Sequence, residues 1–187
     1  TESIQALWDE QNLGTQAILR ERKHKTQKIL DFSGLLPLNG KRILEVGCGT
    51  GKTLASMIEF GAEAGNLYGL DLLHDRIEEA KSRYPNIHFQ CVNAEQLYFQ
   101  NASFDLILLF TVFSSILDDD MAKNVAAQVY RVLKPGGAVL WYDFRYNNPN
   151  NPNVRGITKT HIKNLFQEME MDLHSITLLP PLARRLG

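Results

Sequence analysis

The chain has 187 residues and a formal net charge of -1, with 20 Lys and Arg against 21 Asp and Glu. That length suits one domain with a substantial core. The near-neutral balance gives no reason to expect nucleic acid or an anionic membrane as a partner. No apolar run is long enough to span a membrane, no signal peptide opens the chain, and Cys48 and Cys91 are the only cysteines. We therefore expect a cytoplasmic protein with reduced thiols.

Residues 2–31 are predicted to be helical, and Ser33-Gly34 together with the stretch from Pro37 to Gly40 ends that region. Strands and helices then alternate. We expect strands at residues 42–46, 66–70, 87–92, 104–110, 138–142 and 173–179, and helices at residues 53–60, 74–83, 118–133 and 158–169. This order predicts an α/β fold, a Rossmann-like, doubly wound, mostly parallel sheet with helices on both faces. No linker divides the chain, so residues 1–187 are expected to form a single domain.

A glycine-rich turn follows the first predicted strand. The strand at residues 42–46 includes Glu45 and runs into Gly47, Gly49 and Gly51. Glycines can adopt positive φ and carry no Cβ, so a ligand can lie against bare backbone at this turn. A strand-to-helix turn without a ligand is the simpler alternative.

Two other glycine-loop motifs fit this turn poorly. A dinucleotide fingerprint needs a third glycine where Lys52 stands. A phosphate-binding P-loop needs its first glycine where Val46 stands. The turn therefore favours neither a nicotinamide cofactor nor a nucleoside triphosphate as its ligand.

Polar residues also follow the next two strands. Asp71 ends the second strand, where a carboxylate can accept hydrogen bonds from two ribose hydroxyls or cap the following helix. Asn93-Ala94-Glu95 follows the third strand, either as a ligand-binding turn or as a simple strand end. Ligands of such sheets bind beyond the carboxyl ends of the strands, so these residues are expected to share one site.

Four motifs in this order resemble those of class I S-adenosylmethionine-dependent methyltransferases. They are the acid and glycine turn at residues 45–51, Asp71, Asn93-Ala94-Glu95, and Lys134-Pro135-Gly136-Gly137 before the fifth strand. Asn93 stands where the family usually has Asp. The resemblance implies S-adenosylmethionine as the cofactor, S-adenosylhomocysteine as the product, and residues 1–38 as a helical lid. The cofactor-binding residues that it implies are Glu45, Gly47, Cys48, Gly49, Asp71, Leu72, Asn93, Ala94, Glu95 and Phe110.

The residues after the fifth strand are the candidates for binding the methyl acceptor. Asp143 stands at the carboxyl edge and is the best placed general base. The loop at residues 144–156, called the acceptor loop below, offers Arg145, Tyr146 and several Asn side chains. These groups suit a polyhydroxylated acceptor, and this part of the chain is similar to small bacterial members associated with glycan modification. Alternatively, the Asn residues only close turns. We expect O-methylation of a sugar or a similar small polar molecule.

Further expectations concern partners, metals and the end of the chain. We expect a small-molecule acceptor, no nucleic acid, no membrane and no metal, and a homodimer is an open possibility. Class I methyltransferases usually carry a seventh strand between the fifth and the sixth, for which residues 180–187 leave too little chain. We therefore expect that strand to be absent. The alternatives to an enzyme of this class are a non-catalytic S-adenosylmethionine-binding protein and an NAD-dependent oxidoreductase.

Overall fold

The structure is a computed structural model that describes residues 13–149 and 151–176. The chain divides into two compact units, one formed by residues 38–171 and the other by residues 1–37 and 172–187. In the described part of the second unit, one helix is formed, α2 (Leu13–Phe32). The first residues of the predicted N-terminal helix lie outside the described part of the chain. None of the helices that the structure describes is both long and apolar enough to cross a bilayer. The expectation of a single domain remains a prediction.

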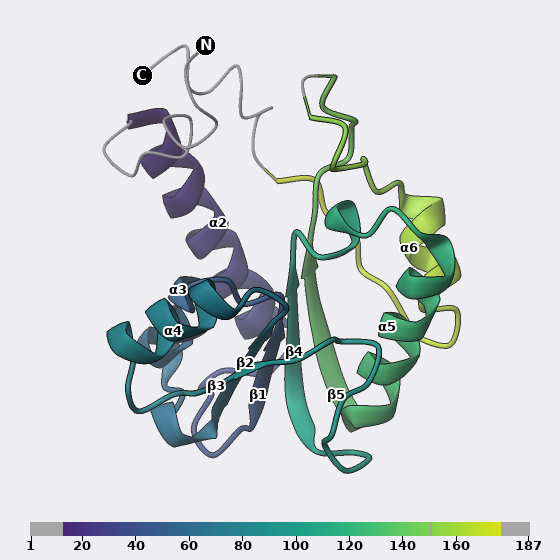
Figure 1. The fold of residues 1–187 in the computed structure, drawn as a ribbon. Helices are drawn as coiled ribbons and strands as arrows, with labels where there is room; N and C mark the ends of the chain where they lie inside the picture. The colour runs from purple at the N-terminus through teal and green to yellow at the C-terminus, as the bar shows by residue number, and fades with distance from the viewer. Residues whose placement is uncertain (1–12, 150, 177–187) are drawn as a thin grey trace. The chain divides into compact units, whose positions relative to one another are not determined.

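The larger unit is a five-stranded parallel sheet with the order β3-β2-β1-β4-β5 (Figure 1). Its elements along the chain are β1 (Ile43–Val46), α3 (Lys52–Ser56), η1 (Met57–Phe60), η2 (Ala64–Asn66), β2 (Leu67–Asp71), α4 (His74–Arg83), β3 (His88–Cys91), β4 (Phe104–Phe110), η3 (Phe113–Ser115), α5 (Asp119–Val132), β5 (Leu133–Tyr142) and α6 (Lys159–Leu165). The predicted fold class is confirmed. The strand order reverses between β1 and β4, so the topology places a ligand site beyond the carboxyl ends of those two strands.

The central strands are buried because helices cover both faces of the sheet. Helices α3 and α4 lie on one side and α5 and α6 on the other (Figure 1). All four residues of β1 are buried, and β4 is buried except at Asp105. These strands consist almost entirely of apolar residues, which is typical of parallel strands with two covered faces. In the register of the sheet, Glu45 lies between Gly69 and Leu108, so it is a buried acidic residue in the central strand.

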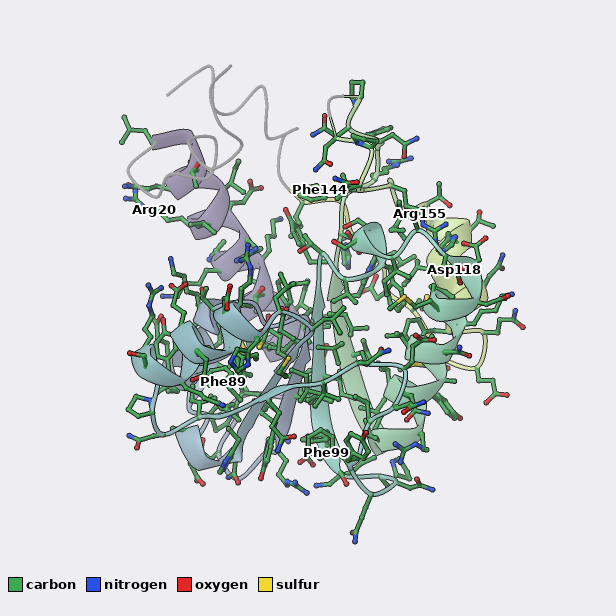
Figure 2. All side chains as sticks on the ribbon, viewed as in Figure 1. Arg20, Phe89, Phe99, Asp118, Phe144 and Arg155 are labelled. Carbon is green, nitrogen blue, oxygen red and sulfur yellow. The ribbon has the colours of Figure 1, made fainter. Side chains whose placement is uncertain are left out.

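The amino-terminal edge of the sheet has a structural role. Asp105 accepts hydrogen bonds from the Arg42 amide at 2.9 Å and the Lys134 ammonium at 2.8 Å, as expected for a residue far from the ligand edge. Phe99 packs edge-on against Phe104, with ring centroids 4.8 Å apart. Figure 2 shows Phe99 at the opposite end of the sheet from Phe144 and Arg155.

Two predicted helices are shorter than expected. The helix predicted at residues 53–60 changes to a 3-10 turn after Ser56, whose hydroxyl donates to the Thr53 carbonyl at 2.6 Å. Such a local side-chain bond competes with regular helix geometry. The helix predicted at residues 158–169 ends at Leu165, because Phe166 leaves helical geometry with φ -125° and ψ 53°.

The predictions for the last two strands were partly wrong. The turn expected at residues 134–137 lies inside β5, whose pairing moves from Phe104↔Leu133 to Leu106↔Ala138 around Gly136 at φ 75°. No strand forms at the described residues 173–176 of the predicted sixth strand, because they pair with no neighbour among the described residues. Residues 177–179, and the segment at 180–187 discussed for a seventh strand, lie outside the described residues.

Candidate functional site

The glycine turn after β1 has the conformation that its sequence predicts. Gly47, Gly49 and Gly51 have φ values of 71°, 51° and 78°, which other residues rarely adopt. At two of these glycines a side chain would also meet a neighbour. A Cβ at Gly47 would lie 3.1 Å from Val112, and a Cβ at Gly51 would lie 2.6 Å from the Phe89 ring.

Gly49 differs from the other two glycines. The nearest atom to a Cβ added there would be Nη1 of Arg76, at 3.7 Å. The positive φ favours glycine at this position, but an added Cβ would meet only ordinary van der Waals contact inside the protein. The turn therefore leaves room for a ligand against the backbone of Gly49, as the cofactor implied by the sequence requires. The Arg76 guanidinium, which sequence reasoning missed, lies beside that space because it stands on the first turns of α4.

Asp71 joins β2 to the glycine turn. Its Oδ2 accepts from the Gly49 amide at 2.8 Å and its Oδ1 accepts from the Leu73 amide at 2.9 Å. Each carboxylate oxygen has two acceptor positions, so both can still accept from ribose hydroxyls. The next residue, Leu72, has a 63% exposed side chain and offers an apolar surface at the same edge.

Cys48 is buried and chemically quiet. Burial raises the pKa of its thiol, and the nearby carboxylates of Glu45 and Asp71 raise it further. The sulfur lies where a Cβ on Gly69 would come within 2.9 Å of it, so Gly69 makes room for it against β2. Cys48 therefore supports the turn from below as a neutral packing group and not as a nucleophile.

The turn at residues 93–95 closes on itself. The Asn93 side-chain oxygen accepts from the Glu95 amide at 2.9 Å, and the Glu95 carboxylate accepts from the Asn124 amide group at 2.9 Å. The Glu95 amide is therefore already used inside the turn. The Ala94 amide takes no part in these contacts, and the Asn93 oxygen keeps one acceptor position. The predicted adenine contacts remain predictions, with Ala94 as the better backbone candidate.

A strained turn follows β4. Thr111 has φ 57°, although a β-branched residue strongly disfavours this region. Its amide donates to the Tyr142 carbonyl at 2.7 Å, and its carbonyl accepts from the Ser114 and Ser115 hydroxyls. The turn places Val112 against Gly47, while Phe110 packs on Tyr142 with ring centroids 5.8 Å apart. Nothing in the sequence signals positive φ at a threonine, so this feature of the site could not be predicted.

Asp143 lies at the carboxyl end of β5, beside that strained turn. Its Oδ2 accepts from the Ser114 amide and its Oδ1 from the Phe144 amide, both at 3.1 Å. Burial raises the pKa of the Asp143 carboxyl, although the hydrogen bonds from Ser114 and Phe144 act in the opposite direction. A raised pKa brings a carboxylate closer to the range in which it accepts protons at neutral pH.

The structure separates the side chains of the acceptor loop into two groups. Arg145 and Tyr146 are exposed, with the guanidinium 5.5 Å from the centre of the Tyr146 ring. By contrast, Asn147 accepts from the Gly156 amide at 2.7 Å and Asn151 accepts from the Asn153 amide at 3.1 Å. These two Asn side chains stabilise the loop itself, which is the simpler of the two roles considered for them.

A glycine turn at a strand-order reversal, a carboxylate at the end of β2 and a half-buried acid after β5 all lie at the carboxyl edge of the sheet, where α/β proteins bind their ligands. Comparison with known proteins identifies the class of protein. Residues 43–137 match the family described as "Methyltransferase domain", which is just over half of the chain. The chain therefore belongs to this methyltransferase family. S-adenosylmethionine is the cofactor that this membership and the sequence motifs imply.

Several curated relatives carry methyltransferase names. A demethylmenaquinone methyltransferase of Lactococcus lactis is 28% identical over 168 residues, covering 87% of this chain and 63% of the relative. A ubiquinone/menaquinone biosynthesis C-methyltransferase UbiE of Vibrio cholerae is 31% identical, with 84% and 55% covered. The O-methyltransferase cnsE of Penicillium expansum is 32% identical, with 62% and 42% covered. The chain thus spans about half of the length of the curated relatives that it matches.

Solved structures share the fold. A putative sarcosine dimethylglycine methyltransferase from Galdieria sulphuraria has a TM-score of 0.68 at 17% identity, with 80% of this chain and 60% of that chain covered. The PH0226 protein from Pyrococcus horikoshii has a TM-score of 0.62 at 20% identity, with 82% and 86% covered. At these identities the likeness establishes the architecture alone.

Proposed function

We propose that this protein transfers a methyl group from S-adenosylmethionine to a hydroxyl-bearing small molecule held at the carboxyl ends of β4 and β5. The observation that carries the proposal is the position of Asp143. It is a half-buried carboxylate with a raised pKa, and it is hydrogen-bonded to the same turn that contacts the glycine turn through Val112. When bound, the cofactor supplies an electrophilic methyl group.

The residues of the chain supply alignment and a proton acceptor. Gly47, Gly49 and Asp71 hold the adenosine part, so that the acceptor must approach from the side of Phe110 and Asp143. The acceptor oxygen loses its proton to the Asp143 carboxylate as its nucleophilic character develops. With S-adenosylmethionine bound, these residues would hold the acceptor oxygen in line with the sulfonium methyl group; the cofactor would supply that methyl and be left as S-adenosylhomocysteine.

A sugar is the first candidate acceptor. Arg145 can pair with its hydroxyls and Tyr146 can stack on an apolar sugar face, and both side chains are exposed. The Asn side chains support this candidate less than the sequence suggested, because Asn147 and Asn151 stabilise the loop.

A hydroxylated aromatic ring is the second candidate, favoured by two observations. Relatives are named for methylation of ubiquinone and menaquinone precursors. In addition, apolar and aromatic side chains lie at this edge of the sheet. Phe110 and Tyr142 end β4 and β5 and pack on each other, and the 53% exposed Leu117 lies in the segment after β4. Asp143 would act in the same way on a phenolic proton, and methylation would then fall on oxygen or on an activated ring carbon.

The test is transfer of label from S-[methyl-14C]adenosylmethionine to separate pools of oligosaccharides and of reduced naphthoquinones. Label in the sugar pool supports the first candidate, and label in the naphthoquinol pool supports the second. Carbon-13 NMR of the product separates a methyl ether from a ring methyl group. Asp143→Asn is expected to reduce turnover about tenfold or more. The Arg145→Ala, Tyr146→Ala double variant is expected to raise KM for a sugar. S-adenosylhomocysteine binding without transfer to either pool would instead favour a non-catalytic cofactor-binding protein.

A further inference from the structure

Ser114 connects the proposed base to the acceptor loop. It is completely buried, and its amide donates to Asp143 at 3.1 Å. Its carbonyl accepts from the Arg155 amide at 2.8 Å. If residue 155 moved away, a buried carbonyl would be left without its hydrogen bond, which is costly. The position of the Ser114 backbone, and with it the hydrogen bond from its amide to Asp143, therefore depends on Arg155.

The Arg155 side chain is held by one carboxylate. Its Nη1 lies 2.6 Å from Oδ1 of Asp119, in the first turn of α5, and the Arg155 side chain is 24% exposed. Its Nε and Nη2 are buried and have no hydrogen-bond partner among the described residues. Asp119 is thus the carboxylate that balances the charge of the largely buried Arg155 guanidinium. Loss of that carboxylate would favour movement of Arg155 into water.

The two ends of the acceptor loop are bonded to each other. The Gly156 amide donates to Asn147 at 2.7 Å, and the Ile157 amide donates to the Phe144 carbonyl at 2.7 Å. The two backbone segments approach so closely that a Cβ on Gly156 would lie 2.6 Å from the backbone of Tyr146. A displacement at Arg155 would therefore be transmitted to Phe144, whose amide also donates a hydrogen bond to Asp143. Phe144 and Arg155 lie at the same end of the sheet (Figure 2).

We propose that the Asp119–Arg155 ion pair is a latch that holds the acceptor loop against Ser114 and thereby keeps the Asp143 carboxylate in place. Asp119 and Arg155 are then positioning residues of the transfer reaction, and this part of the inference rests on the proposed function. The sequence offers no sign of the pair, because its two members lie 36 positions apart.

The neighbouring residue Asp120 provides a matched control. It also stands in the first turn of α5 and also has one ion pair, to Lys123 at 2.8 Å, but that partner lies on the same helix. Asp119→Asn and Asp120→Asn remove the same charge from the same helix end, so they weaken the favourable interaction with the helix dipole equally. Only Asp119→Asn releases the latch.

Amide hydrogen exchange, followed by NMR, tests the latch without any substrate. In Asp119→Asn, we expect exchange at the amides of Arg155, Ile157 and Ser114 to accelerate about tenfold, as loss of a charge-assisted bond implies. Asp120→Asn should leave these rates at the wild-type values. Arg155→Gln should match Asp119→Asn, the double variant should add nothing further, and Asp119→Glu should restore slow exchange. Equal rates in Asp119→Asn and Asp120→Asn, or faster exchange at Arg155 with Ser114 unchanged, would overturn the proposal.

A second arm tests the link to Asp143 once an acceptor has been found. Asp119→Asn should lower kcat and shift the pH profile of kcat relative to wild type and Asp120→Asn, while the Kd for S-adenosylhomocysteine stays unchanged. An unchanged profile in Asp119→Asn would show that the latch does not position the base. If the wild-type protein transfers no methyl group at all, the proposed function fails, and the exchange experiment still decides whether the latch exists.

Discussion

The substitution Gly49→Ala should weaken cofactor binding without unfolding the protein. Gly49 has φ 51°, and an alanine in this region costs about 1–2 kcal/mol, because its Cβ crowds the following carbonyl. The nearest atom to the new Cβ would lie 3.7 Å away, so no clash inside the protein adds to that cost. For a domain of this size the expected decrease in Tm is roughly 2–8 °C. The same Cβ would occupy space that the cofactor needs, and overpacking of that kind costs roughly 1–3 kcal/mol, or about 5–150-fold in Kd.

Gly40 provides the control for this substitution. It has φ 65° and no atom within 4 Å of an added Cβ, so Gly40→Ala introduces the same backbone strain away from the site. Thermal denaturation should show similar losses of stability for both variants. Isothermal titration with S-adenosylhomocysteine should show weaker binding for Gly49→Ala alone. If Gly49→Ala folds and binds S-adenosylhomocysteine as tightly as Gly40→Ala, the cofactor does not lie against this turn.

Further predictions follow from the surroundings of individual residues. Burial raises the pKa of Asp143, so kcat should rise with pH as this carboxyl ionises at a pKa above the usual Asp range. A flat pH profile of kcat in the wild type, or the same profile in Asp143→Asn, would exclude this base. The same raised pKa means that the folded state binds this proton more tightly than the unfolded state, so its contribution to the free energy of unfolding is lost as pH rises through the folded pKa. The exposed Cys91 thiol lies 3.4 Å from the Leu72 carbonyl, so saturating S-adenosylhomocysteine should slow its alkylation by iodoacetamide, as measured by mass spectrometry. Buried Cys48 should stay unmodified with or without ligand. Unchanged alkylation of Cys91 would place the adenine elsewhere. Asp71→Asn removes a charged acceptor for two amides and for the ribose. Hydrogen bonds to charged groups contribute about 1.5–3 kcal/mol, so the Kd for S-adenosylhomocysteine should rise about tenfold or more. The exposed Asp75→Asn is the control and should leave this Kd unchanged.

The parts of the fold that could be predicted are those that local patterns determine. The run Phe104–Phe110 is apolar at all but one position, and the structure forms β4 over the same residues. Asp71 and the glycine turn could be placed together because parallel strands bring their carboxyl ends to one edge. Residues 173–176 show the limit of this reasoning. The apolar residues Leu173 and Ile176 are compatible with a strand, but a strand also requires a neighbouring strand to pair with, and the sequence does not reveal one.

The parts of the site that could not be predicted depend on contacts between distant residues. Thr111 holds positive φ because Tyr142, Ser114 and Ser115 all bond to its backbone, and these bonds offset a local preference against that conformation. The pairing of Arg155 with Asp119 likewise follows only from tertiary structure. The sequence placed Asp143 correctly at the carboxyl edge, but its burial and its two amide donors emerge only from the fold.

The most direct test of the central claim is an amide chemical-shift titration of the wild-type protein with S-adenosylhomocysteine and, separately, with NAD. We expect S-adenosylhomocysteine to shift the amides of Gly47, Gly49, Leu72 and Ala94 in a saturable manner. We also expect the amide of Phe99, at the opposite edge of the sheet, to stay unchanged, and NAD at the same concentration to have no effect. Saturable shifts at the glycine turn with NAD, or no shifts there with S-adenosylhomocysteine, would contradict the assignment of this site to S-adenosylmethionine.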